Sequence, residues 1–417
     1  KRSQLKPELG TLDFNKTRNR NLRMSDEANN GTLPEGWNSI QLGNDETAKT
    51  SSGGTPSRSK PDYFKGNIKW VKSGELNDNL IFDTEEKISE IGLAKSSAKL
   101  FPPDTLLIAL YGATAGRTAI LKTEAATNQA VCAIFPKNNS FDSEFLQYQL
   151  IFQRPKILGA RSGGAQPNIS QRVLGNLEIT LPPLPEQKAI AKVLRSVQEA
   201  KEARAGELRL ERERKNALMD YLFTRGARGE SLKQTEIGEM PESWEVARLG
   251  EMITLQRGKD LPIQDRVKGD IPIVGSNGIV GFHNQTANMP IPCVATGRSG
   301  SIGLITYVDK PYWALNTALY VSDYKANHPL FIYYWLHLFD FKRYAEGASV
   351  PTLNRNKVHP VKFRLPTIEE QKEIAEVLQA CDEKISALEN ETSLLDEFFK
   401  AMLEELMSGN LRTLSLC

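Results

Sequence analysis

Loops rich in Arg, Lys, Asn, Gln, Ser and Thr carry the side chains of this chain that could do recognition chemistry. Arg, Lys, Asn and Gln hydrogen-bond to the edges of nucleic-acid bases, and Ser, Thr and backbone amides bind phosphates. In the first half of the chain the candidates are Ser57, Arg58, Lys60, Lys72, Thr114, Arg117, Asn128, Gln129, Arg161, Gln166 and Asn168. In the second half they are Arg257, Lys259, Ser276, Asn277, Arg298, Ser299, Asn316, Thr317, Asn354, Arg355 and Lys357. Turns of any sheet protein share this composition, and for each arginine a structural salt bridge is an equal alternative.

A catalytic constellation is not evident in the sequence. The segment YGATAGRTA, residues 111–119, resembles a phosphate-binding loop but lacks the Lys-Ser/Thr ending that the motif requires. The four cysteines form no CxxC pair and the four histidines are far from them in sequence, which argues against a zinc site and against disulfides. We therefore predict no metal site and no catalytic residues. A net charge of +2 is low for a nucleic-acid binder, so any DNA-binding face must be local.

The candidate loops lie within a duplicated sequence. LPPLPEQKAIAKVL, residues 181–194, recurs as LPTIEEQKEIAEVL, residues 365–378, at an offset of 184. Upstream, Val173 is matched to Val358 after a one-residue slip. Each copy therefore ends in a helix that follows a Leu-Pro pair.

Each copy also begins in the same way. Residues 33–45 and 240–252 share a Pro, a Trp and a Leu-Gly pair, at an offset of 207. The first interior is thus 23 residues longer than the second, and the two interiors differ in sequence. Shared frames with different interiors indicate one scaffold that carries two different binding surfaces.

Short apolar runs inside each copy predict strands, at residues 105–110, 130–135, 292–296 and 318–322. Single helices are predicted at residues 142–153 and 329–339. This balance predicts an α+β fold with a mainly antiparallel sheet in each of two similar globular domains.

Two helices of roughly 40 residues follow the domains. In the second, apolar residues recur at steps of four and three from Ile374 to Leu406, a heptad seam that requires a partner helix. The equivalent seam of the first helix is charged in its middle. The segment 186–224 has nine basic and seven acidic residues, and 369–408 has three basic and twelve acidic residues. We therefore predict an antiparallel intramolecular coiled coil with pseudo-twofold symmetry, roughly 57 Å long at 1.5 Å per residue.

The remaining segments are less informative. Residues 1–32 are polar and are interpreted as an arm without an assigned role. The sequence has no apolar run of about 18 residues and no signal-peptide pattern, so we expect a cytoplasmic protein without membrane contact.

With these motifs the chain resembles the DNA-specificity (S) subunit of type I restriction-modification systems. The resemblance covers about residues 33–412, and it implies target-recognition domains at 33–182 and 240–365, conserved helices at 183–226 and 366–412, and a linker at 227–239. It further implies that each domain reads one half of a bipartite, asymmetric site in double-stranded DNA. The implied partners are two methyltransferase (M) subunits and, in the full assembly, restriction (R) subunits. The subunit itself would be non-catalytic, with S-adenosylmethionine, Mg and ATP bound by those partners. A coiled-coil adaptor whose end domains bind other proteins is the alternative.

Overall fold

The computed structural model describes residues 33–44, 46–159, 169–347 and 351–413. The chain divides into two compact units, Lys1–Glu199 with Asp396–Cys417 and Ala200–Leu395. Residues 1–32, interpreted from sequence as an arm, lie outside the described residues.

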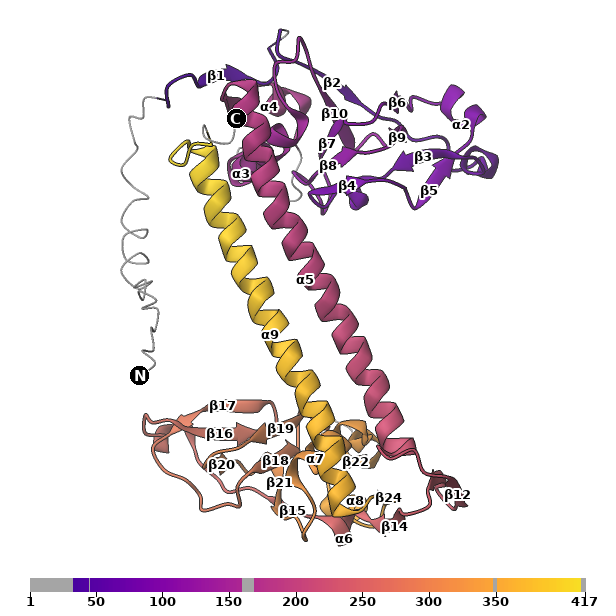
Figure 1. The fold of residues 1–417 in the computed structure, drawn as a ribbon, viewed down its shortest axis with the longest axis vertical. Coiled ribbons are helices and arrows are strands. Elements are labelled where there is room, and N and C mark those ends of the chain that lie inside the picture. Colours follow the sequence, from indigo (N-terminus) through magenta and orange to yellow (C-terminus); the bar gives the residue numbers. More distant parts are fainter. Residues whose placement is uncertain (1–32, 45, 160–168, 348–350, 414–417) are drawn as a thin grey trace, which may run out of the picture. The chain divides into compact units, whose positions relative to one another are not determined.

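The core of the first unit is a five-stranded sheet in the order β2-β10-β7-β8-β4. Its strands are antiparallel except for β4, which runs parallel to β8. The sheet and its covering helix are β2 (Ala48–Ser52), β4 (Asn79–Ile81), β7 (Leu106–Ala109), β8 (Thr118–Leu121), β10 (Val131–Pro136) and α3 (Ser143–Gly159). All residues of β7 and β8 are buried, because α3 and a second sheet cover this sheet (Figure 1).

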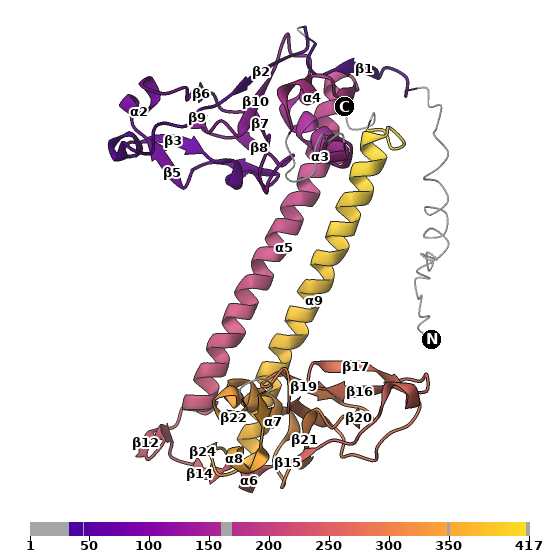
Figure 2. The same cartoon turned by 180° about the vertical axis from the view of Figure 1, so that it is seen from behind.

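That second sheet has the order β5-β3-β9-β6 and lies farther from α3 (Figure 2). Its elements, with the short helices beside it, are β3 (Ile68–Val71), β5 (Glu86–Ile88), α2 (Glu90–Ala94), β6 (Leu100–Phe101), β9 (Ala125–Thr127), η1 (Pro61–Phe64) and η2 (Ser73–Glu75). Trp70 of β3 is buried and donates its indole N–H to the Gly54 carbonyl at 3.0 Å. The segment after β2 is thereby fixed to this sheet.

The second unit repeats this plan with fewer strands. Its sheets have the orders β15-β21-β18-β19 and β17-β16-β20, and α7 packs on the first of them. The elements are β15 (Thr254–Arg257), β16 (Ile271–Gly275), β17 (Gly278–His283), β18 (Cys293–Gly297), β19 (Ile305–Val308), β20 (Trp313–Ala314), β21 (Ala318–Asp323), α7 (Pro329–Leu338), η3 (Ile263–Asp265) and η4 (Phe341–Tyr344). Among the described residues of this unit, no strand takes the place of β4 or β6, which accounts for part of the extra length of the first interior.

A short two-stranded sheet joins the beginning and end of each interior. In the first unit β1 (Asn38–Gln41) pairs with β11 (Glu178–Leu181), and in the second β14 (Glu245–Arg248) pairs with β24 (Lys362–Leu365). Each Leu-Gly pair continues the pairing, since Gly43 donates to the Gly175 carbonyl and Gly250 to the His359 carbonyl, both at 2.9 Å. The duplicated ends are therefore one structural frame.

Helices α4 (Gln171–Gly175) and α8 (Arg355–Val358) correct one detail of the alignment. Their N-caps are Ser170 and Asn354, which are 184 residues apart. The buried residue that matches Val358 is therefore Leu174 and not Val173. The one-residue slip inferred from sequence is wrong, because burial at this position tolerates either Leu or Val.

Three smaller elements complete the second unit. Hairpins form between β12 (Leu232–Thr235) and β13 (Gly238–Pro241) and between β22 (Ala345–Glu346) and β23 (Thr352–Leu353), and α6 is Leu249–Met252. The segment 227–239, expected as a linker, thus contains most of a hairpin. Its turn uses Gly238 at a φ of 96°, a conformation that glycine adopts readily.

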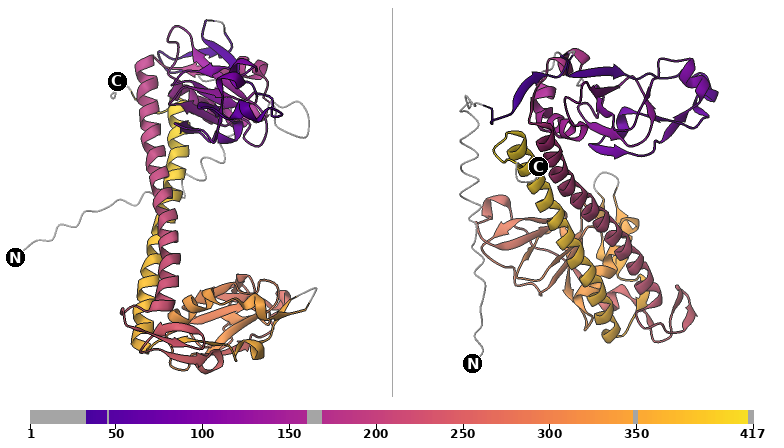
Figure 3. Two further views of the ribbon diagram at one scale, coloured as in Figure 1. Left: turned by 90° about the vertical axis from the view of Figure 1, so that its right-hand side faces the viewer. Right: turned by 45° about the horizontal axis from the view of Figure 1, so that its top comes forward.

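The two long helices are α5 (Leu184–Arg225) and α9 (Ile368–Met407), and within each unit they lie side by side (Figure 3). In the first unit Ile190 and Leu194 share a core with Leu403 and Leu406. In the second, Leu222 and its neighbours pack with the beginning of α9 at Ile374 and Leu378. The low-numbered end of each helix meets the high-numbered end of the other, so the predicted antiparallel pairing is confirmed within each unit.

The charged middle of the α5 seam is paired with α9 inside the second unit. Arg204 pairs with Glu391 at 3.0 Å and Lys384 with Glu211 at 3.4 Å, and Lys215 pairs with Asp382. The predicted α+β fold with two similar domains and two long helices is therefore observed.

Candidate nucleic-acid interface

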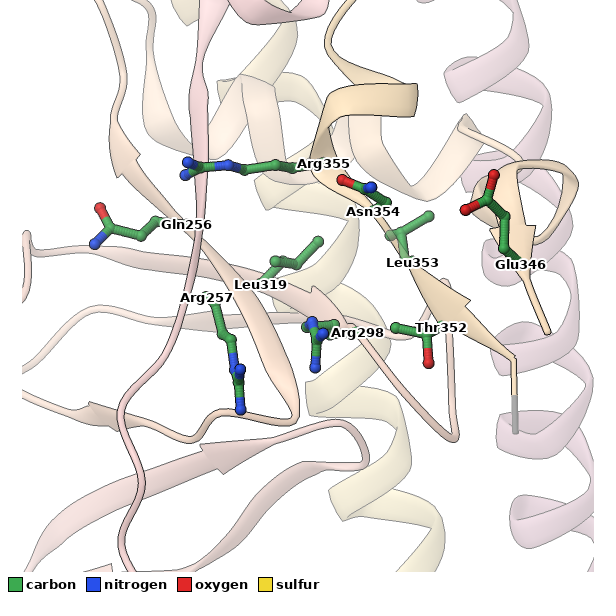
Figure 4. Close-up of a pocket in the computed structure, with 9 residues that line it drawn as sticks. All are labelled: Gln256, Arg257, Arg298, Leu319, Glu346, Thr352, Leu353, Asn354 and Arg355. Carbon is green, nitrogen blue, oxygen red and sulfur yellow. The ribbon is translucent and has the colours of Figure 1, made fainter. Parts of the chain in front are cut away.

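A pocket of about 650 Å³ in the second unit brings together several of the predicted residues. Figure 4 shows its lining, which comes from the β15 end, the loop after β18, β21, the paired strands β22 and β23, and the beginning of α8. The lining residues are Gln256, Arg257, Arg298, Leu319, Glu346, Thr352, Leu353, Asn354 and Arg355. The pocket thus combines three guanidinium groups with neutral donors and acceptors and with the carboxylate of Glu346, which is paired with Lys357 at 3.3 Å.

Arg298 is held by its backbone on both sides. Its N–H donates to the Thr317 carbonyl at 2.8 Å, and its carbonyl accepts from Leu353 N–H at 2.7 Å. The half-buried side chain has no hydrogen bond or ion pair with the described part of the chain. The sheet therefore fixes the Cα while the guanidinium keeps its donors for a ligand.

The other two arginines are bound only to main-chain oxygens. Arg257 Nε donates to the Asn316 carbonyl at 3.3 Å, and Arg355 Nη1 donates to the Leu255 carbonyl at 3.0 Å. Among the described residues neither has a carboxylate within 4 Å. Each guanidinium has five N–H donors, so both retain free donors and a full charge.

His359 holds the strand that carries Arg257. Its Nε2 accepts the Leu255 N–H at 3.2 Å, while Arg355 binds the carbonyl of the same residue. Burial lowers the pKa of His359, so its ring is neutral at pH 7 and can accept this bond. The N–H and the carbonyl of Leu255, on the unpaired edge of β15, are therefore both hydrogen-bonded.

A second cluster, in the first unit, lines a pocket of about 480 Å³ with Arg58 and Lys72. Arg58 binds both oxygens of Glu86 at 2.6 and 3.2 Å and lies 4.2 Å from the Phe64 ring centre. Lys72 lies 2.8 Å from Glu85 and 3.1 Å from Glu86. The hydrogen bond from Arg58 lowers the pKa of Glu86, and the bond to Glu85 raises the pKa of Lys72. Both predicted cations are therefore neutralised by neighbouring acids.

Arg117 belongs to a structural network. It pairs with Asp78 at 2.6 Å, and Arg154 pairs with the same carboxylate. Gln198 of α5 donates to the Asp78 carbonyl at 2.8 Å. The network joins α3, through Arg154, and α5, through Gln198, to the segment that contains Asp78. Arg117 therefore has the structural salt bridge that was the alternative to a DNA contact.

The other predicted residues are dispersed around these two pockets. Ser57 bonds to Ser59, Lys60 to Tyr63, Thr114 to the Ser73 carbonyl, Asn128 to Ala130 N–H, Gln129 to Thr55, Lys259 to the Ala287 carbonyl, Ser276 to Asn277, Asn316 to Asp260, and Lys357 to Glu346. Ser299 and Thr317 lie next to Arg298 and bond through their backbones. Arg161, Gln166 and Asn168 lie outside the described residues.

Several charged and polar residues in or beside these pockets were absent from the predicted set. Gln256 precedes the predicted Arg257, and Glu346 and Thr352 come shortly before the predicted Asn354 and Arg355 in the sequence. Glu85 and Glu86 had no signal in sequence beyond being adjacent acids.

The described residues include neither a metal-binding cluster nor a membrane-spanning helix. No cluster of His, Cys, Asp and Glu there has the composition of a metal site. None of the helices in the same part of the chain is long and apolar enough to cross a membrane.

Comparison with known proteins agrees with the duplicated frame. A family model described as the type I restriction modification DNA specificity domain matches residues 34–210 and 241–395. A specificity subunit of the type I restriction enzyme MjaVIII from Methanocaldococcus jannaschii is 23% identical, over 92% of this chain and 95% of the relative. The EcoR124I/EcoR124II specificity subunit of Escherichia coli is 27% identical over 36% of this chain and 38% of the relative.

Solved structures show the same fold. The S subunit of a type I restriction-modification system from M. genitalium has a TM-score of 0.62 at 18% identity and covers 89% of this chain and 96% of that one. A chain from a structure of a type I R-M system has a TM-score of 0.55 at 16% identity and covers 91% and 100%. With two matched segments that span most of its length, the chain belongs to the family of type I restriction-modification DNA specificity subunits.

Proposed function

We propose that this chain selects the DNA target of a type I restriction-modification complex by reading a bipartite, asymmetric site. Each unit reads one block of the site, and the paired helices set the unread spacer between the blocks. The observation that carries this proposal is the repeated frame with different pocket residues, because two unlike surfaces on one scaffold would read two unlike sequences. Family membership supports DNA reading over the coiled-coil adaptor alternative.

The chain would act without a catalytic centre of its own. Two methyltransferase subunits would bind it and bring S-adenosylmethionine, and restriction subunits would bring ATP and Mg chemistry. The relatives support this arrangement, since they are specificity subunits.

Methylation mapping tests the function directly. In cells that express the chain with its methyltransferase subunits, we expect methylated sites that share two short, different blocks at one fixed spacing. Cells with the methyltransferase subunits alone are the control and should show no such pattern. A single uninterrupted motif, or no common motif, would contradict the proposal.

Glu86→Gln should increase affinity for non-specific DNA. The substitution removes the carboxylate that binds Arg58, so Arg58 becomes available to phosphates, whereas Lys72 stays paired with Glu85. We expect a gain on the order of threefold to tenfold at low salt and a steeper salt dependence, because each new phosphate contact releases counterions. Titration of a labelled duplex by the complex at several salt concentrations measures both effects.

Glu90→Gln is the matched control. Glu90 is exposed in α2 of the same unit, and within the described chain no basic side chain pairs with it. It removes the same charge without releasing a cation, so its effect should be smaller. Equal effects of the two variants would mean that net charge alone, and not the release of Arg58, changes the affinity.

A further inference from the structure

Arg298 and Leu110 lie at the same position in the two copies of the fold. We call such a pair of corresponding positions, identified by matching backbone hydrogen bonds, a node. Leu110 donates its N–H to the Ala130 carbonyl at 2.7 Å and accepts from Ile169 N–H at 2.6 Å. Arg298 makes the corresponding bonds to Thr317 and Leu353. Ile169 and Leu353 directly precede the caps of α4 and α8, so the two positions correspond element by element.

The side chains at this node differ in kind. Leu110 is 7% exposed and belongs to the hydrophobic core of the first unit. Arg298 extends into the pocket of the second unit in the same direction as Arg257, and Arg355 extends along a different direction (Figure 4). At this position the first unit thus has an apolar side chain packed in its core, whereas the second unit has a cation that lines a pocket.

The other two arginines of the pocket, Arg257 and Arg355, also correspond to neutral residues of the first unit. Strand pairing sets Ser52 opposite Cys132 in the first unit and Arg257 opposite Leu319 in the second, at corresponding ends of β2 and β15. Gln171 and Arg355 are each the first residue of their helix. All three arginines of the pocket therefore replace neutral residues of the first unit.

We propose that Arg298 is a specificity-determining residue that reads a guanine in the block recognised by the second unit, and that Arg257 holds the adjacent phosphate. This inference rests on the proposed DNA-reading function. A guanidinium forms two parallel hydrogen bonds with O6 and N7 of guanine in the major groove. The backbone bonds of Arg298 fix its Cα, and its side chain has no acceptor among the described residues, so its donors are available to a base edge. Gln256, Thr352 and Asn354 supply neutral hydrogen-bonding groups around it.

At the positions that match these three arginines the first unit has Leu110, Ser52 and Gln171, so the two units should contribute unequally to DNA binding. Arg58 and Lys72 of the first unit are paired with Glu85 and Glu86, whereas the three arginines of the second pocket are not paired with described carboxylates. The salt dependence of binding should therefore come mainly from the second unit.

To test the inference, Arg298 and Arg257 are each replaced by the residue type found at the corresponding position of the first unit. Arg298→Leu and Arg257→Ser are each prepared in the complex with methyltransferase subunits. For Arg298→Leu, methylation mapping should show loss of preference for one guanine in one block. Discrimination at that position should fall by about 10- to 100-fold, and the other block should not change. Arg257→Ser should weaken binding to all sequences and reduce the salt slope by about one.

Arg298→Lys serves as a second variant that retains the charge but lacks the planar fork. It should weaken the guanine preference, because an ammonium does not match O6 and N7 with two parallel coplanar donors, and it should keep its affinity for non-specific DNA. If Arg298→Leu does not fold, as judged by amide hydrogen exchange of the second unit, the lysine variant decides the question.

Two results would overturn the inference and leave the proposed function intact. In the first, the wild-type complex methylates a bipartite site, and the variants keep every preference within both blocks. In the second, Arg298→Leu weakens binding uniformly across sequences, which is the behaviour of a phosphate contact. A wild-type complex without a bipartite site would instead overturn the proposed function, and the inference with it.

Discussion

Gly43→Ala should destabilise the first unit by about 2–4 kcal/mol, in the range of severe steric substitutions. A Cβ at this position would lie 2.5 Å from Gly175 Cα and 2.9 Å from the Gly175 carbonyl oxygen. Both atoms belong to the backbone, so no side chain can rotate away. The contact is close because Gly43 N–H donates to that same carbonyl at 2.9 Å, where the β1-β11 pairing continues. Amide hydrogen exchange of β1 and β11 in the full chain would report the loss as faster exchange.

The chain provides controls at equivalent positions. A Cβ on Gly175 would lie 3.6 Å from Gly43 Cα, an ordinary contact, so Gly175→Ala should change stability little. In the second unit, a Cβ on Gly250 meets the His359 Cβ at 3.0 Å, which predicts an intermediate effect that is confined to that unit. Equal exchange in the Gly43→Ala and Gly175→Ala proteins would refute the close backbone approach as the cause.

The repeated frame could be predicted from the sequence because its residues recur at fixed offsets. The contacts that these residues make could not be predicted. The tryptophans and the Glu-Gln pairs were matched separately in the two copies. In the structure Trp37 donates its indole N–H to Glu186 at 3.2 Å, and Trp244 donates to Glu370 at 2.8 Å. These partners are 149 and 126 residues apart in sequence, so no local pattern could join them.

The glutamines show the same limit. Gln187 accepts from Asp142 N–H and Gln371 from His328 N–H, both at 2.9 Å. Each therefore ties the beginning of a long helix to the residue that precedes α3 or α7. Repetition indicated that these residues matter, and only the fold shows which group each of them satisfies.

The binding surface was less predictable than the frame. Composition cannot separate Arg58, which is bound by Glu86, from Arg298, which has no described partner, because Glu86 reaches Arg58 from β5, 28 residues away in the sequence. The match of Arg298 with Leu110 was also hidden. The offset there is 188, whereas the flanking helix starts are offset by 184, and the two side chains share no property.

The buried carboxylate of Glu186 has the most consequential ion pair of the frame. It is 1% exposed and accepts from Arg412 Nε at 2.7 Å and Nη2 at 2.9 Å, in addition to Trp37. Burial favours the neutral acid, but the hydrogen bonds from Arg412 and Trp37 outweigh it and hold the pKa of Glu186 below its usual value. A carboxylate whose pKa is lower in the folded state stabilises that state above its unfolded pKa, near 4.3. This stability is lost as the pH falls through the folded pKa.

Arg412→Met should reverse the sign of this pH dependence. Without the guanidinium, burial becomes the dominant influence and raises the pKa of Glu186 above its unfolded value. Folding then takes up a proton, so the contribution of Glu186 is greatest below about pH 4.3 and declines as the pH rises through the raised pKa. At pH 7 the first unit should lose hydrogen-exchange protection by roughly one to two orders of magnitude, since a buried charge has lost its partner. Exchange measured from pH 4 to 7 would give the slope.

Arg228→Met is the matched control, because the equivalent arginine of the second unit pairs with Glu373 instead of the buried Glu370. Glu373 is 45% exposed, and water replaces its lost partner, so the second unit should keep the slope of the wild type. The comparison isolates burial from charge, since both variants remove one arginine at the same place in the repeat. If Arg412→Met retains the wild-type slope, water must reach Glu186 in the variant, and the carboxylate would not be the buried anchor of the first unit.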